Sequence, residues 1–149
     1  GDLRAALAEF EASATLAPGD PDYLIWLGVL RFELGDLDEA ENAFETARAL
    51  CETDYDFLLK RAQDFFRVGN LEEASADVEQ AILERPDAAG GYVLRASVAE
   101  ERGDCASALA DLERAMGLAS AADDAWLEGE ILVRRAMLAQ SCQPSTPTP

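Results

Sequence analysis

The sequence contains no histidine and a single lysine, Lys60. Without histidine the chain cannot build Ser–His or Cys–His nucleophile pairs, or a metal site with imidazole ligands. No other catalytic motif is present, and the many Asp and Glu pairs are typical of solvated helix faces in an acidic chain. We therefore expect that the protein is not an enzyme, has no catalytic residues, and binds no metal and no cofactor.

Cysteine is also scarce. Cys51, Cys105 and Cys142 lie far apart, and none belongs to a Cys-x-x-Cys motif. This spacing fits neither a zinc site nor the cysteine framework of a small disulfide-rich domain. We expect three reduced thiols and, because disulfides are rare in reducing compartments, a cytoplasmic location.

Long apolar runs and positive charge are missing as well. No apolar run is long enough to cross a bilayer, so we expect no direct membrane insertion. Twelve basic residues against 30 acidic ones give a formal net charge of −18. Nucleic acids and anionic membrane surfaces would be repelled, which leaves a neutral to basic protein or peptide as the expected partner. The alternative is that the negative charge only keeps the protein in solution and selects no partner.

A short phrase recurs four times in the sequence. It reads GDLRAA, GDLDEA, GNLEEA and GDCASA, and its first glycines, Gly1, Gly35, Gly69 and Gly103, are each 34 residues apart. Small and large apolar residues keep the same step: Ala40, Ala74 and Ala108; Ala47, Ala81 and Ala115; Phe10, Phe44, Val78 and Leu112. A fixed period of this length is typical of a solenoid of stacked units.

Each glycine is expected to lie at the corner between two helices. The residue after it has a side chain that can accept a hydrogen bond from a free backbone N–H at the start of a helix. These caps are Asp2, Asp36, Asn70 and Asp104. Apolar residues then follow at helical spacing. We expect helices at residues 2–17, 21–34, 37–51, 54–68, 71–85, 88–102, 105–118 and 122–140.

A 34-residue helix–turn–helix unit with these residues resembles a tetratricopeptide repeat. The residues that carry the resemblance in the first full unit are Leu27, Gly28, Gly35, Ala40, Phe44 and Ala47. The resemblance extends to about Gln140, although Glu52 and Ser120 stand where the family's helix-ending proline would fall. It implies an all-α fold, an α-solenoid of stacked helix–turn–helix repeats wound into a right-handed superhelix.

The period also predicts how the chain is divided. We expect one domain at residues 1–141, made of a half repeat at 1–20, repeats at 21–54, 55–88 and 89–122, and a closing helix at 122–140. A proline-rich tail at 142–149 is expected to be disordered. Trp126, Val133 and Met137 should pack the closing helix on the previous unit.

The first helix carries an apolar stripe of Leu3, Leu7, Phe10 and Leu16. A half repeat would leave this stripe in water, because the other helix of its unit is missing. We expect an upstream segment or a second copy to cover it, so a homo-oligomer through the N-terminal helix is one candidate.

The family resemblance implies a scaffold or adaptor that binds a segment of a partner protein in a concave groove. The first helix of each unit would line this groove, and helical spacing selects its residues. The predicted groove residues are Ile25, Trp26, Val29, Phe32, Leu59, Gln63, Phe66, Val93, Ser97 and Leu127. Two alternatives stay open: these residues pack between helices, or the chain is a structural or self-association module of a larger protein without a peptide ligand of its own.

Two ion pairs are expected within the repeats. Arg61 and Arg95 each lie eight residues before a repeat glycine, and Asp77 and Asp111 each lie eight residues after it. The first full unit has neither the base nor the acid at those places. The joint loss indicates that Arg61 pairs with Asp77 and that Arg95 pairs with Asp111.

Overall fold

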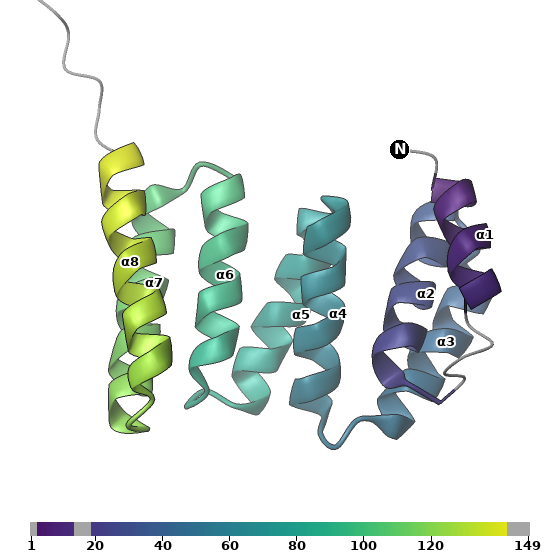
Figure 1. The fold of residues 1–149 in the computed structure, drawn as a ribbon, viewed down its shortest axis with the longest axis horizontal. Helices are drawn as coiled ribbons and strands as arrows, with labels where there is room; N and C mark the ends of the chain where they lie inside the picture. Colours follow the sequence, from purple (N-terminus) through teal and green to yellow (C-terminus); the bar gives the residue numbers. More distant parts are fainter. Residues whose placement is uncertain (1–2, 14–18, 143–149) are drawn as a thin grey trace, which may run out of the picture. The chain divides into compact units, whose positions relative to one another are not determined.

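The structure is a computed structural model that describes residues 3–13 and 19–142, and in these ranges the protein is all-α (Figure 1). The helices are α1 (Leu3–Ser13), α2 (Pro21–Leu34), α3 (Leu37–Leu50), α4 (Asp54–Val68), α5 (Leu71–Glu84), α6 (Ala89–Glu101), α7 (Cys105–Ala121) and α8 (Ala125–Ser141). They form two compact units, Gly1–Glu84 with α1–α5 and Arg85–Pro149 with α6–α8. In unit 1, α2 pairs with α3 and α4 pairs with α5; in unit 2, α6 pairs with α7.

The repeated glycines form the corners between paired helices, as predicted. Gly35, Gly69 and Gly103 have φ angles of 86°, 85° and 75°, a left-handed conformation that other residues adopt only with strain. Two of the predicted caps are confirmed: Asn70 accepts a bond from the Glu73 N–H at 3.2 Å, and Asp104 accepts one from the Ser107 N–H at 3.1 Å.

The prediction of a side-chain cap at Asp36 is wrong, because that residue makes no capping bond. Asp2, the fourth predicted cap, lies outside the described residues. Two caps were missed because they do not follow a repeat glycine. Thr53 accepts a bond from the Asp56 N–H at 3.1 Å, and Asp124 accepts one from the Leu127 N–H at 3.0 Å.

Small residues let the paired helices approach closely. The alanines of the two repeated series from Ala40 to Ala115 are all fully buried. Gly28 of α2 faces the ring of Phe44 of α3, and a Cβ added at Gly28 would lie 2.5 Å from Phe44 Cε1. A larger side chain would therefore push α3 away from α2 or force the ring to move.

The prediction for the face of α8 that packs inward is wrong. Trp126, Val133 and Met137 are 77%, 61% and 67% exposed, and Ile131 and Leu138 are buried instead. The register explains the difference. Trp126 lies 34 residues after Tyr92, whose ring lies 5.8 Å from the guanidinium of Arg114 on the paired helix α7. No paired helix follows α8 in the described residues, so its equivalent face is in contact with solvent.

The prediction of three reduced thiols is also wrong for two of them. Cys105 and Cys142 form a disulfide across a Cα–Cα distance of 6.0 Å, while Cys51 is free. Because α7 and α8 are paired by a short turn, the first residue of α7 meets the residue that follows α8. The two cysteines are 37 residues apart in the sequence, so their spacing did not indicate that they would meet.

Both predicted ion pairs are confirmed. The Arg61 guanidinium donates to the two Asp77 carboxylate oxygens at 2.7 and 2.6 Å. Arg95 binds Asp111 in the same way, at 2.8 and 2.7 Å. The Asp77 side chain is only 7% exposed, so its charge depends on this bidentate contact.

Replacing Arg61 by alanine leaves the buried Asp77 carboxylate without its partner. We expect Arg61→Ala to lower the free energy of unfolding by about 3 kcal/mol in urea denaturation followed by circular dichroism. Arg48→Ala is the matched control, because Arg48 makes the same bidentate contact with Asp54 at an exposed site and its loss should change little. Equal effects of the two substitutions would contradict a special role for the Arg61–Asp77 pair.

The disulfide should stabilise unit 2 by restricting the unfolded chain. We expect Cys142→Ser to lower the free energy of unfolding of the oxidised protein by about 4 kcal/mol, as the closure of a loop between residues 37 positions apart predicts. The difference from the wild-type protein should vanish when both are measured in a reducing buffer. Cys51→Ser serves as the control, since Cys51 takes no part in the bond. A difference that persists in the reducing buffer would show that the serine itself disturbs the packing.

Candidate partner-binding surfaces

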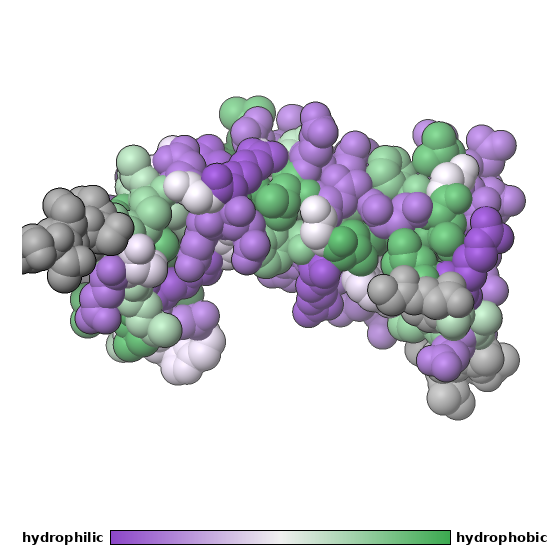
Figure 2. Space-filling view, turned by 90° about the horizontal axis from the view of Figure 1, so that it is seen from above, coloured by the Kyte–Doolittle hydropathy of each residue, from purple (hydrophilic) through white to green (hydrophobic). Residues whose placement is uncertain are grey.

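Hydrophobic residues reach the surface between hydrophilic ones on the face shown in Figure 2. The predicted groove residues differ in how far they are exposed to solvent. Ile25 and Val29 are fully buried and lie in the core of unit 1. Gln63 is exposed. The remaining ones are half-buried: Trp26, Phe32, Leu59 and Phe66 in unit 1, and Val93, Ser97 and Leu127 in unit 2.

A cavity of about 530 Å³ lies between α1, α2 and α4 in unit 1. We call it the α1–α2–α4 cavity. It brings together two of the predicted groove residues, Trp26 and Gln63. Its other lining residues are Phe10, Asp20, Asp22, Tyr23, Lys60, Asp64 and Arg67.

Three aromatic rings form the apolar part of this cavity. Phe10 stacks on Tyr23 with the ring centroids 4.7 Å apart, and its centroid lies 6.4 Å from that of Trp26 in an edge-on arrangement. Phe10 belongs to the predicted stripe of α1, and α2 covers part of that stripe. Leu3, Leu7 and Phe10 are accordingly half-buried, and Leu16 lies outside the described residues.

The charged residues of the cavity contact one another. Lys60 binds Asp22, and Arg67 donates to Asp64 at 2.9 Å. Burial raises the pKa of Asp64 to about 6, although the neighbouring Arg67 acts in the opposite direction. Helical spacing counted from Ile25 missed Asp22 and Tyr23, which lie with Trp26 on the face of α2 that reaches the cavity.

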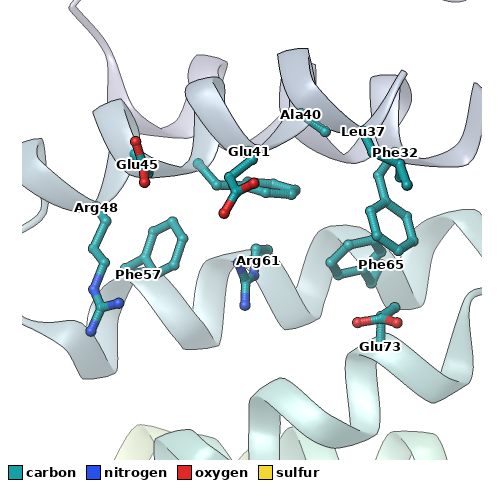
Figure 3. Close-up of a pocket in the computed structure, with 11 residues that line it drawn as sticks. Phe32, Leu37, Ala40, Glu41, Glu45, Arg48, Phe57, Arg61, Phe65 and Glu73 are labelled. Atoms are coloured by element: carbon teal, nitrogen blue, oxygen red, sulfur yellow. The ribbon is translucent and has the colours of Figure 1, made fainter. Parts of the chain in front are cut away.

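A second cavity, of about 430 Å³, lies between α3, α4 and the start of α5 (Figure 3). We call it the α3–α4 cavity. Phe32, which was predicted for the groove, lines this cavity and not the first one. Its ring lies edge-on to Phe65 with the centroids 5.2 Å apart. Two hollows with apolar walls therefore lie on unit 1.

In unit 2 the predicted groove residues contact α8. The Arg134 guanidinium donates to the Ser97 hydroxyl at 2.7 Å and to Glu100 at 3.1 Å. It also reaches the backbone carbonyl of Val93 at 3.4 Å. One arginine thus spans three residues along α6, a role that the sequence did not indicate.

The described residues include no group of acids and cysteines arranged to hold a metal ion. In the same part of the chain, none of the helices has both the length and the apolar character needed to cross a membrane.

Comparison with known proteins gives one family and several similar folds. Family models described as tetratricopeptide repeat match residues 1–50 and 59–127. A comparison with curated protein sequences finds no match.

Among solved structures, PcrH from Pseudomonas aeruginosa is 19% identical over 80% of this chain and 91% of that one, with a TM-score of 0.60. PcrH in complex with the chaperone-binding region of PopD is 20% identical over the same shares, with a TM-score of 0.60. The thermophilic protein TTC0263 from Thermus thermophilus is 22% identical over 94% of this chain and 79% of that one, with a TM-score of 0.53. These likenesses show the fold.

The buried carboxylate of Asp64 should make stability depend on pH. Because its folded-state pKa is raised above the value of about 4 in an unfolded chain, the folded state binds more protons in this window, and stability falls as pH rises from about 4 to about 6. Asp64→Asn removes this titration. Relative to the wild-type protein, we expect its free energy of unfolding to rise by about 2 kcal/mol between about pH 4.5 and about pH 7.5 in urea denaturation.

The other carboxylates titrate in both proteins, so their contribution cancels when the free energies of unfolding are subtracted at each pH. Asp22→Asn is the control on the same cavity, since Asp22 is exposed. A difference between Asp64→Asn and the wild-type protein that does not change with pH would contradict the raised pKa.

Proposed function

Since the chain belongs to the tetratricopeptide repeat family, we propose that it is a protein-interaction scaffold that binds a segment of a partner protein in the α1–α2–α4 cavity. The observation that carries the proposal is the aromatic wall of Phe10, Tyr23 and Trp26 in a cavity of about 530 Å³. Aromatic residues at such surfaces supply much of the binding energy in many interfaces.

Because the charged residues of the cavity are paired with one another, we expect an apolar side chain to anchor the bound segment. Lys60 is paired with Asp22 and Arg67 with Asp64, so the rings are the main apolar surface that the cavity offers to a bound segment. Charged rims of this kind set the register of a bound segment more than its affinity. The net charge of −18 favours the approach of a neutral to basic partner.

The similar folds support binding of a protein segment. PcrH is described in complex with the chaperone-binding regions of PopD and of PopB. A helical repeat with the fold of this chain therefore has the means to bind a segment of another protein. The groove residues that do not line the cavity stay predictions: Phe32, Leu59, Phe66, Val93, Ser97 and Leu127.

The cytoplasmic location also stays a prediction. The Cys105–Cys142 disulfide weighs against it, because disulfides persist mainly in oxidising compartments. Fractionation of the source cells with an antibody to the chain would decide between the compartments.

One observation favours the second candidate, a structural or self-association module. Trp126, Val133 and Met137 present an exposed apolar face on α8. Exposed faces of this kind often mark contacts with another protein or another copy. Leu3 and Leu7 of the N-terminal helix, which are half-buried, offer a second apolar surface.

A photo-crosslinker placed at Gln63 tests the proposed cavity. Benzoylphenylalanine at Gln63, which lines the cavity, should form an adduct with a partner protein in the source cell. The same group at Gln80, exposed on α5 and away from the cavity, is the control. Trp26→Ala should reduce the Gln63 adduct about tenfold, because it removes an aromatic anchor. Circular dichroism would confirm that this variant is folded.

Three outcomes are informative. An identified partner at Gln63 but not at Gln80 supports binding in the cavity. Equal adducts at both positions contradict it. An adduct of twice the mass of the chain identifies a second copy as the occupant and favours the self-association module.

A further inference from the structure

We propose that the α3–α4 cavity of unit 1 is a second interaction surface, which takes an apolar side chain flanked by basic residues from a partner protein. This surface is separate from the α1–α2–α4 cavity. Phe57, Arg61 and Phe65 of α4 line the second cavity, whereas Lys60, Gln63, Asp64 and Arg67 line the first. Helical spacing places these two sets on different faces of α4.

The floor of the cavity is aromatic and fixed in place. Phe44 lies 6.5 Å from Phe57 and 6.1 Å from Phe65, measured between ring centroids. The Arg61 guanidinium lies 4.9 Å from the centroids of both Phe44 and Phe57, and its bidentate contact with Asp77 holds it there. Leu37 is 57% exposed at the edge of this floor. The three rings are nearly buried, so an apolar side chain that entered the cavity would meet a fixed aromatic floor and, beside it, the exposed Leu37.

The charges of the lining are not balanced. Arg48 and Arg61 are the two cations, and each is already bound to an acid outside the lining, Asp54 and Asp77 respectively. Figure 3 shows Glu41 and Glu45 on α3 on one side of the cavity and Glu73 on α5 on the other. The described residues place no cation within ion-pair distance of these three carboxylates. The uncompensated charge is therefore negative on both sides.

The two acids of α3 repel each other. Glu41 and Glu45 are four residues apart on one helix, a spacing at which like charges destabilise the helix. A basic residue bound between them would remove this repulsion and add attraction of its own. Charge complementarity therefore selects an occupant with positive charges beside its apolar group.

The lining is not a general feature of the repeat. One period later, the residues equivalent to Phe44, Phe57 and Phe65 are Val78, Gly91 and Ala99. The three rings therefore do not recur at the next junction between repeats, and they are particular to the place where α3 of the repeat at 21–54 meets α4 of the repeat at 55–88. The small alanines between paired helices recur in every full repeat. The helix packing that the repeats share therefore does not require the three rings.

Synthetic peptides test the proposal directly. The probe is a blocked, fluorescein-labelled peptide of sequence GSGRRLFRRGSG, and GSGRRAARRGSG is its counterpart with the same charge but no large apolar side chain. Fluorescence anisotropy at low salt measures the affinity of each for the full chain. The double variant Glu41→Gln/Glu45→Gln removes the acids at the cavity. Glu72→Gln/Glu79→Gln removes two exposed acids of α5 that do not line it, and so matches the change in net charge.

We expect Glu41→Gln/Glu45→Gln to weaken binding of the Leu-Phe peptide about fivefold relative to the matched control. Leu37→Ala should weaken the Leu-Phe peptide but not the Ala-Ala peptide. Equal affinities of the two double variants, or of the two peptides, would overturn the proposal and show attraction to net charge alone. A second copy as the occupant would also overturn it, and would appear in sedimentation velocity as a dimer that Leu37→Ala dissociates.

Discussion

Close contact between paired helices over small side chains is the constraint on which the rest of the structure depends. Gly28 allows the Phe44 ring to lie against α2, and fully buried alanines keep the other pairs equally close. Dense packing of this kind restricts the size of the side chains that fit at neighbouring positions. The large Phe44, Phe57 and Phe65 rings are buried beside these contacts and bound the α3–α4 cavity.

The period of 34 residues made most of the helices and turns predictable. α2 and α4 begin and end at the predicted residues, and the glycine corners have the expected left-handed backbone. The Arg61–Asp77 and Arg95–Asp111 pairs were found because the base and the acid are lost together in the first full unit. Local patterns that repeat are thus well specified by the sequence.

Features that occur once were harder to predict. The exposed face of α8 contains the same residue types as a buried one, and only the lack of a paired helix in the described residues decides its environment. The Cys105–Cys142 bond depends on where two distant residues meet. For the candidate site, two of the residues that spacing selected for a groove, Trp26 and Gln63, line the α1–α2–α4 cavity, whereas Ile25 and Val29 lie in the core. A stripe of apolar residues does not show which side of the helix is covered.

The disulfide also determines how unit 2 would respond to mechanical tension. Cys142 follows the last turn of α8, and its bond leads directly to Cys105 at the first turn of α7. A pull on the chain beyond Cys142 would therefore pass through the sulfur atoms to Cys105 and bypass the backbone of both helices. The segment from Cys105 to Cys142 would carry no load, so α7 and α8 would keep their pairing while α6 was drawn away from them.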